Sequence, residues 1–384
     1  MQLVTDNTPF VTKIYLLHLH LLLLQIKIHI MNKTRYYYLD ALRVFLTCIV
    51  FYHHSAIAFG ASGGWYNKAA VTTTGLTQAL LSASMGIDQS YFMSLFFFIS
   101  ALLMPLSFHR KGTKSFIMDR LNRLGIPLAI YFFILNPLLN YWIYGSWGGF
   151  GLGPMWFVFT LLLFELLYVV CQKLPNINIP KWNKPSTIGI ISFMLISGTV
   201  AFLVRLIVPT GDSVLGLQLG YFPLYIGMYA LGIVAQHNQW MDKINIKDSK
   251  PWFLLAILIG IPTMLITMGS CRDKMDNFSG GWNMQAVFYA FWEPIMCVGI
   301  SYFLLVFNKE FCNKPNRIIQ KMSANSFAFY FIHPYVVVGF TFLVGLFAIP
   351  PITGLAIVCI LGIPVCFIIA MVIKKCFRFI GIKL

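Results

Sequence analysis

The chain has 384 residues, of which 58% are hydrophobic and only 10% are charged, and its formal net charge is +16. Its mean hydropathy of +0.76 and its recurring long apolar stretches exclude a soluble globular protein and are typical of a helical membrane protein. The eight cysteines show no paired spacing, which excludes a disulfide framework and offers no cysteine-based metal site.

Apolar segments long enough to cross a membrane as helices follow one another through the chain. We expect ten of them, near residues 37–58, 88–107, 126–144, 154–173, 187–208, 220–236, 252–270, 284–307, 325–345 and 352–373. No repeat and no stretch large enough for a soluble domain separates them. The sequence therefore predicts an all-α polytopic membrane protein, a bundle of about ten transmembrane helices, with residues 31–384 as one membrane-embedded domain.

Residues 1–30 do not fit this pattern. Their apolar run is interrupted by His18, His20, Lys27 and His29, so it is too polar for a span, and it lacks the cleavage site of a signal peptide. We interpret these residues as an uncertain N-terminal extension, either an interfacial helix or a misassigned start.

Positive charge is distributed unevenly between alternate loops of the ten predicted spans. One side has four cations, Lys68, Arg205, Arg272 and Lys274. The other side has nineteen, which are Arg110, Lys111, Lys114, Arg120, Arg123, Lys173, Lys181, Lys184, Lys243, Lys247, Lys250, Lys309, Lys314, Arg317, Lys321, Lys374, Lys375, Arg378 and Lys383. Because cytoplasmic loops retain Lys and Arg, we expect both ends of the ten-span frame in the cytoplasm. The net charge of +16 then reflects cytoplasmic cations that face anionic lipid, and it does not indicate binding to nucleic acid.

Two polar residues of the first span share a helix face. Arg43 and His54 are eleven residues apart, which is close to three helical turns and roughly 16 Å along the axis. A fixed cation and a titratable imidazole are costly in lipid, so the pair indicates a polar, proton-handling path across the membrane. The alternative is that Arg43 snorkels to the interface and His54 only bonds a neighbouring helix. Asp40, three residues before Arg43, is placed to pair with it.

Two residues of the spans are candidates for acid–base chemistry. His54 is the candidate general base, because an unperturbed imidazole titrates near pH ~6.5, whereas His53 points about 100° away. Glu293 lies in the outer half of the eighth span, where an unpaired carboxylate costs a few kcal/mol. It is either a catalytic group that orients His54 or bonds the acceptor, or the partner of a buried cation. The histidines are not spaced as metal ligands are and have no carboxylates near them in the sequence, so no metal site is expected.

Arg120 and Arg123 lie three residues apart at the cytoplasmic start of the third span, where we expect them to share a face. Guanidinium forks suit phosphate oxygens, so these residues are candidates for binding a phosphate-bearing co-substrate. Ordinary positive-inside anchoring is the alternative. On the outer side, Trp65, Trp156 and Trp282 are candidates for stacking on a substrate ring, or else members of the interfacial aromatic belt.

Five segments in order resemble the motifs of the acyltransferase-3 family of integral membrane acyltransferases. They are Tyr38-Leu39-Asp40-Ala41-Leu42-Arg43 followed after ten residues by His54, then 95–101, 120–127, 153–157 and 326–334. The order over residues 37–340 is specific, although each motif alone is degenerate. The segment Trp292-Glu293-Pro294 resembles the corresponding segment of the branch that modifies glucans.

The resemblance implies an enzyme of a bacterial plasma membrane that acylates extracytoplasmic carbohydrate or other cell-envelope acceptors. Acyl-CoA is then the co-substrate, with Arg120, Arg123 and Arg43 as its binding residues and no bound cofactor. We expect His54 to deprotonate an acceptor hydroxyl, so that an acetyl or succinyl group passes to it across the bilayer. A proton-coupled secondary transporter would use the same intramembrane Asp, Arg, His and Glu residues, although neither repeats nor paired broken helices are evident. A structural or sensory protein is a further alternative, but it would not need Arg43 and His54 on one helix face.

Overall fold

The computed structural model describes residues 35–69, 73, 75–174, 181–347, 349–379, 381, 382 and 384. Contacts divide the chain into two units, residues 1–37 and residues 38–384. The fold described below is that of the second unit. The predicted N-terminal extension, residues 1–30, lies outside the described residues.

Helices make up 80% of the structure, and no strand is formed by the residues it describes. The first spans are α2 (Tyr37–Ala58), α3 (Gly75–Lys111) and a composite third span of α4 (Thr113–Arg120), η1 (Leu121–Gly125), α5 (Ile126–Ile130), η2 (Tyr131–Leu135) and α6 (Asn136–Tyr144). The middle spans are α7 (Trp156–Cys171) after η3 (Gly153–Met155), α8 (Thr187–Arg205) and α9 (Phe222–His237) after η4 (Leu219–Tyr221). The last are α11 (Ile246–Leu255), η5 (Ala256–Gly260) and α12 (Ile261–Ser270), then α13 (Met284–Phe311), α14 (Arg317–Gly345) and α15 (Pro351–Phe379), with short α10 (Trp240–Lys243) and η6 (Arg272–Phe278) in connections.

Ten helices or composite helices within the described ranges are long and apolar enough to cross a membrane, which confirms the predicted fold class. The second span differs most from the prediction, because α3 begins at Gly75 and not near residue 88. Its extra turns contain Ser82 and Ser84, which lower the local hydropathy. Tertiary packing still buries Leu81 and Met85 in the core that also contains the end of α2.

Close helix contacts depend on glycine. Helix α9 packs along α3, and α13 packs against α8, α11 and α3. A Cβ atom at Gly232 of α9 would lie 2.5 Å from the Phe98 carbonyl oxygen of α3, and one at Gly299 of α13 would lie 2.5 Å from the Trp252 carbonyl oxygen of α11. Small residues at such positions let helix backbones approach in a membrane, where van der Waals packing is a main source of association energy.

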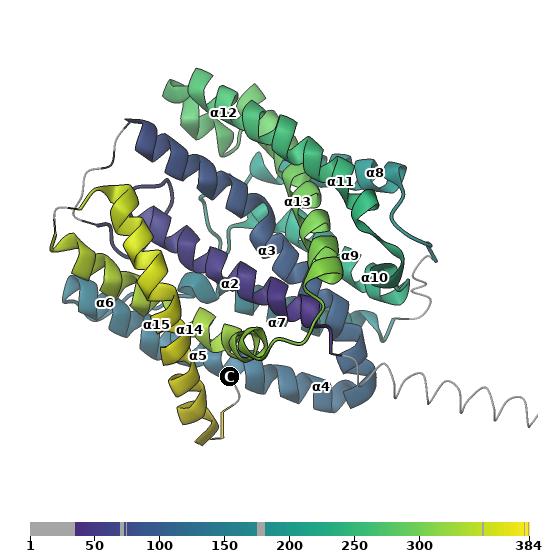
Figure 1. Cartoon of the computed structure of the whole chain (residues 1–384), viewed down its shortest axis with the longest axis horizontal. Helices are drawn as coiled ribbons and strands as arrows, with labels where there is room; N and C mark the ends of the chain where they lie inside the picture. Colours follow the sequence, from purple (N-terminus) through teal and green to yellow (C-terminus); the bar gives the residue numbers. More distant parts are fainter. Residues whose placement is uncertain are drawn as a thin grey trace, which may run out of the picture. The chain divides into compact units, whose positions relative to one another are not determined.

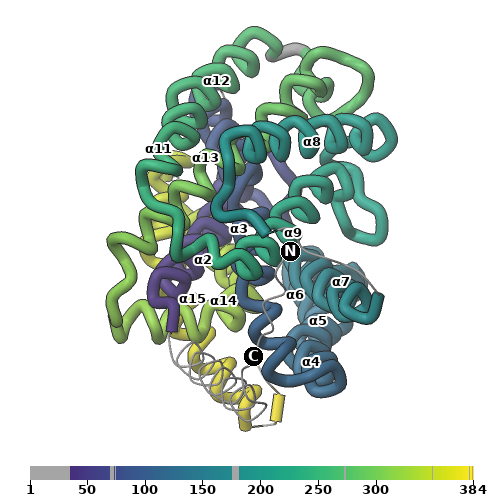
Figure 2. The backbone as a smooth tube through the Cα atoms, turned by 90° about the vertical axis from the view of Figure 1, so that its right-hand side faces the viewer, coloured from purple at the N-terminus to yellow at the C-terminus, as the bar shows by residue number. Residues whose placement is uncertain are grey.

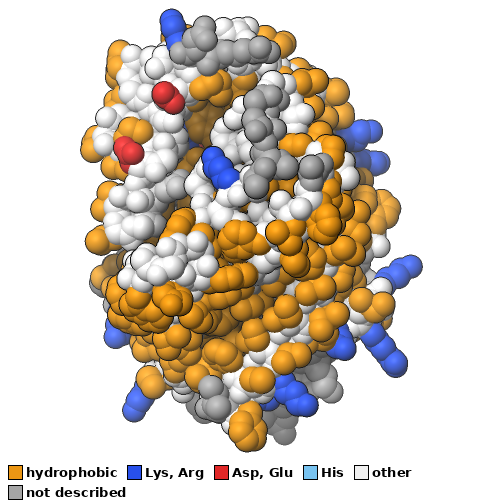
Figure 3. Space-filling view, turned by 90° about the vertical axis from the view of Figure 1, so that its left-hand side faces the viewer, with side chains coloured by type: hydrophobic (Ala, Val, Ile, Leu, Met, Phe, Trp, Pro, Cys, Tyr) orange, Lys and Arg blue, Asp and Glu red, His pale blue; other side chains and the backbone are white. Residues whose placement is uncertain are grey.

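Burial separates central helices from lipid-facing ones. In the most apolar window of α2, 61% of residues are buried, against 17% in the α11–α12 span. Figures 1 and 2 place α2 and α3 between the α11–α13 helices and the α4–α7 helices. Hydrophobic side chains cover much of the face in Figure 3, as lipid contact requires. Asp40 and His53 of α2 and Asp88 and Ser94 of α3 therefore lie inside the protein.

Candidate active site

The C-terminal half of α2 brings His54 into a group of three stacked rings. The imidazole lies on the indole of Trp65, from the segment after α2, with 4.1 Å between ring centroids. The His333 ring of α14 is stacked on it with a centroid distance of 5.2 Å. His54 Nδ1 is buried and has no hydrogen-bond partner among the described residues. A ring nitrogen without a protein partner leaves His54 able to handle a proton.

His333, which lies in the 326–334 segment of the sequence, is the third ring of this group. Its Nδ1 lies 2.6 Å from the Tyr330 carbonyl oxygen, which can only accept, so Nδ1 carries the hydrogen. The lone pair of a neutral ring is then on Nε2, a buried atom without a hydrogen-bond partner among the described residues. The sequence signal was its place in the 326–334 motif, but only the fold shows that it meets His54.

His53 faces a different environment, as its angular offset on α2 predicts. Its ring is stacked on Phe92 of α3, with centroids 4.9 Å apart. Its Nδ1 lies 3.9 Å from the Asp88 carboxylate of the same helix. The distance is too long for a direct hydrogen bond. Asp88 therefore belongs to the surroundings of His53.

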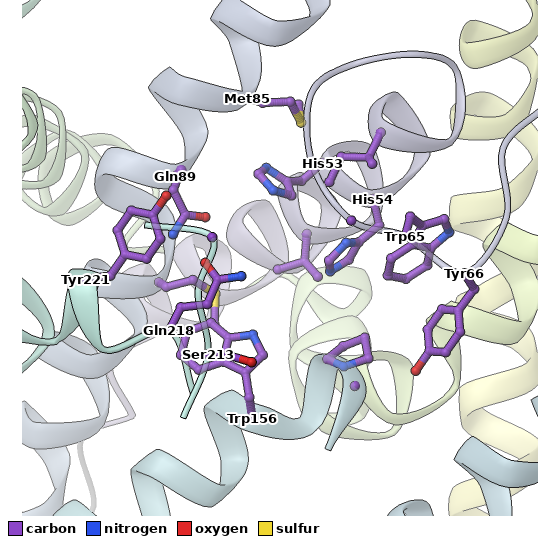
Figure 4. A pocket seen from close by; sticks show the side chains of 18 of the residues that line it. His53, His54, Trp65, Tyr66, Met85, Gln89, Trp156, Ser213, Gln218 and Tyr221 are labelled. Carbon is purple, nitrogen blue, oxygen red and sulfur yellow. The ribbon is translucent and has the colours of Figure 1, made fainter. Parts of the chain in front are cut away.

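Both histidines line a cavity of about 780 Å³. Figure 4 shows His53 and His54 on one wall, with Gln89, Ser213, Gln218 and Tyr221 across from them and Trp156 beneath. The wall comes from α2, α3, the segments before α7 and α9, and the segment that carries Trp65. Such a volume is in the range that accepts a small organic ligand, and aromatic rings with a few polar groups are the usual lining.

A hydrogen-bonded network fixes one rim of this cavity. The Tyr66 phenol donates to Asn136 Oδ1 and lies 3.0 Å from the Tyr131 hydroxyl. The Asn136 amide in turn donates to the Gly149 carbonyl at 2.5 Å. Burial raises the pKa of the Tyr66 phenol well above its usual value, so the phenol remains a hydrogen-bond donor.

The three tryptophans predicted to bind substrate lie in three settings. Trp65 and Trp156 both line the cavity. One face of Trp65 is covered by His54, whereas Trp156 is half-buried and stacked on Tyr225 at 5.6 Å between centroids. Trp282 is 83% exposed, packs on Phe202 and is not among the described residues that line the cavity.

Glu293 forms an ion pair with Arg205 of α8, and both side chains are fully buried. The Arg205 guanidinium also donates to the Gly220 carbonyl at 3.0 Å and lies over the rings of Tyr221 and Tyr289. The sequence assigned Arg205 to an outer loop, but it ends α8 inside the bundle. The structure thus gives Glu293 a cation as its neighbour, and the aromatic contacts of His54 do not include it.

Arg43 is held by its predicted neighbour. Its guanidinium lies 3.6 Å from Asp40, which also accepts a hydrogen bond of 2.7 Å from the Ser323 hydroxyl of α14. Helix α2 continues without a break from Arg43 to His54. Arg43 is not among the described residues that line the cavity, so it lies at another level of the bundle.

Arg120 and Arg123 lie nearest to different carboxylates. Arg120 lies 3.2 Å from Glu165 of α7, over the Phe116 ring. Arg123 is half-exposed and lies 3.1 Å from Asp119. Because η1 is a π-helical turn, residues within it advance by a smaller angle than the α-helix assumed from the sequence.

No group of three His, Cys, Asp or Glu side chains within the described part of the chain has the arrangement of a metal site. The fold and the cavity define a multi-pass membrane protein whose helices enclose an imidazole-bearing candidate reaction site.

The chain belongs to the acyltransferase-3 family. The family profile described as Acyltransferase domain matches residues 36–371, nearly the whole chain. The protein is therefore a membrane acyltransferase, as its motifs predicted. No curated protein and no solved structure gives a significant match.

Proposed function

We propose that this acyltransferase moves an acetyl or succinyl group from cytoplasmic acyl-CoA to a hydroxyl of an extracytoplasmic carbohydrate or other cell-envelope acceptor. The observation that carries the proposal is the cavity at the outer end of α2, where His54 meets a space sized for a small organic ligand. The enzyme is then an O-acyltransferase. Its co-substrate is acyl-CoA, and the proposal needs no bound cofactor.

In the proposed reaction His54 removes the proton of the acceptor hydroxyl. The acceptor oxygen bonds to the thioester carbonyl carbon, the carbon–sulfur bond breaks, and the proton passes to the CoA thiolate. The ring stack of Trp65 and His333 fixes the plane of the His54 imidazole and keeps water from one side of it. Glu293 pairs with Arg205 behind the cavity wall, where it stabilises the wall and takes no part in the proton transfer.

The donor would enter at the opposite end of the bundle. Arg120 and Arg123 offer guanidinium groups for its phosphates, and both already have carboxylate partners. Phosphate oxygens of the donor would therefore compete with Glu165 and Asp119. Arg43 lies on the same helix as His54 and would meet the phosphopantetheine arm between the two ends.

The charge distribution supports the sidedness of this proposal. Nineteen cations on one side against three on the other, with the buried Arg205 left out, favour cytoplasmic ends for the ten-span frame in a bacterial plasma membrane. Arg120 and Arg123 are then cytoplasmic, and the cavity beside Trp65 and Trp156 opens outside. Residues 31–384 would act as one membrane-embedded domain.

Thiol release tests the proposal directly. Purified protein in lipid nanodiscs would receive acetyl-CoA or succinyl-CoA together with a cell-envelope glycan extract, and free CoA would be measured. The proposed enzyme releases CoA, and His54→Ala does not. His237→Ala is the matched control, because His237 is exposed at the far end of α9. A proton-coupled transporter would release no CoA under any of these conditions.

A further inference from the structure

The cavity wall facing the histidines carries polar side chains that are neither acidic nor basic. Gln89, Ser213 and Gln218 lie across the cavity from His53 and His54 (Figure 4). The Gln89 amide donates 2.9 Å to the Tyr225 hydroxyl, which leaves its carbonyl oxygen uncommitted. The Gln218 amide makes no hydrogen bond with the described residues. Together these groups offer donors and acceptors to a ligand.

No Lys, Arg, Asp or Glu is among the described residues that line the cavity. One buried cation, Arg205, lies behind Tyr221 and Tyr289, but Glu293 neutralises it and the two rings separate it from the cavity. An anionic ligand would thus find no guanidinium or ammonium partner among the described residues of the cavity lining. Carboxylate or phosphate recognition normally uses arginine or lysine.

Trp156 supplies the third feature of this wall. It lies beneath Ser213 and Gln218 in Figure 4 and is half-buried against Tyr225. An indole face is large, apolar and rigid. A flat platform beside the Gln89 carbonyl oxygen and the Gln218 amide matches a sugar ring, which has an apolar carbon–hydrogen face and hydroxyl groups around its edge.

We propose that Gln89, Ser213, Gln218 and Trp156 form a subsite for an uncharged sugar ring of the acceptor, and that this subsite selects against sugars bearing a carboxylate or phosphate. The inference rests on the proposed function, since it specifies the acceptor. Amides pair equally well with hydroxyl donors and acceptors, so the subsite holds a neutral ring with one of its hydroxyls directed toward the histidines.

The test is binding of matched sugar pairs that differ only in charge. Methyl glucoside and methyl glucuronide, methyl galactoside and methyl galacturonide, and N-acetylglucosamine and N-acetylmuramic acid would be titrated into purified full-length protein in nanodiscs. Saturation-transfer NMR measures binding without turnover. At least one neutral member is expected to bind, at least about tenfold more tightly than its anionic counterpart.

Two substitutions locate the effect at the proposed subsite. Gln218→Met keeps the length of the side chain and removes its hydrogen bonds, so neutral sugars should bind about twofold to tenfold more weakly. Gln218→Arg supplies the missing cation, so the glucuronide should bind at least about tenfold more tightly than to the unaltered protein. Gln78→Arg is the matched control, because Gln78 is exposed in the first turn of α3 and does not line the cavity.

The inference is overturned if anionic members bind as tightly as their neutral counterparts, if no neutral sugar binds, or if Gln218→Met leaves neutral binding unchanged. Thiol release from the same preparations judges the proposed function separately. Gln218-dependent neutral binding without His54-dependent CoA release would retain the subsite and reject the acyl transfer. His54-dependent CoA release without tighter binding of neutral sugars would retain the acyl transfer and reject the subsite.

Discussion

The Arg120 guanidinium lies 3.2 Å from the Glu165 carboxylate in the interior of the bundle. Glu165 is almost fully buried, so the ion pair is shielded from solvent, whereas the Arg123 side chain of the neighbouring Asp119 pair is 52% exposed. Two arginines with the same expected role therefore have unequal surroundings. Their contributions to donor binding must be measured in different ways.

Arg123→Ala should weaken acyl-CoA binding by about tenfold to a hundredfold, because a charge-assisted hydrogen bond contributes about 1.5–3 kcal/mol. Lysine at position 123 should restore only part of the affinity, since it lacks the guanidinium fork. Isothermal titration of purified variants with acetyl-CoA measures both effects. Arg110→Ala, an exposed cation of the same loop region, is the control and should bind normally.

Arg120→Ala alone would mix two effects, because it leaves Glu165 buried without its partner. Arg120→Ala combined with Glu165→Gln removes both charges and should still bind acetyl-CoA about tenfold to a hundredfold more weakly. Glu165→Gln alone should bind at least as tightly as the unaltered protein. Normal affinity in the double variant would reduce Arg120 to a structural residue.

The Arg205–Glu293 pair is expected to act on stability. Glu293→Gln or Arg205→Met should lower the free energy of unfolding by about 3–5 kcal/mol, because each leaves a buried charge unpaired. Replacing both residues, as Arg205→Met with Glu293→Leu, should recover most of that loss. Thermal unfolding in nanodiscs measures these changes.

Turnover separates this structural role from a catalytic one. The pH profile of Glu293→Gln should match that of the unaltered enzyme, because Glu293 faces Arg205. A shifted profile would instead support the sequence hypothesis that this carboxylate orients His54.

The three histidines should differ in their effects on acyl transfer. His54→Ala should lower turnover by about 10²- to 10⁴-fold, as expected for a general base, while His53→Ala costs much less. His333→Ala should cost about twofold to tenfold, because it removes one ring from the stack on His54. Single-turnover rates with saturating acetyl-CoA provide the comparison.

His333→Phe is the informative control for this series, since it keeps an aromatic face against His54 and removes the ring nitrogens. It should regain most of the activity that His333→Ala loses. Complete inactivity of His333→Phe with a normal fold would assign the base to His333 and reject His54 in that role.

The fold could be predicted from the sequence because membrane spans are recognised by length and hydropathy alone. The pairing of Asp40 with Arg43 was equally accessible, since both lie on one helix. Contacts between distant helices were not. No periodicity in the sequence connects His54 with His333, or Arg205 with Glu293. The π-helical turn at η1 also changes the angular spacing that the sequence analysis assumed between Arg120 and Arg123.

Cysteine labelling tests the predicted sidedness. In a variant whose native cysteines have been replaced, Ser62→Cys should react with a membrane-impermeant maleimide in intact cells, and Ser115→Cys should react only after lysis. Both positions are exposed, so access to the reagent depends on the side of the membrane. The opposite pattern would place the Arg120 end outside and reverse the proposed direction of transfer.

The ring that covers His54 comes from a connecting segment, whereas His333 comes from a spanning helix. Trp65 follows α2 after a short stretch that includes Gly60 and Gly63, both with positive φ. The Trp65 ring that shields His54 from water is therefore held by an irregular connecting segment and not by a helix. Substitutions that make this segment more flexible should increase hydrolysis of acyl-CoA, because water would then compete with the acceptor for the thioester. The ratio of hydrolysed to transferred acyl groups, more than the overall rate, should depend on this stretch of chain.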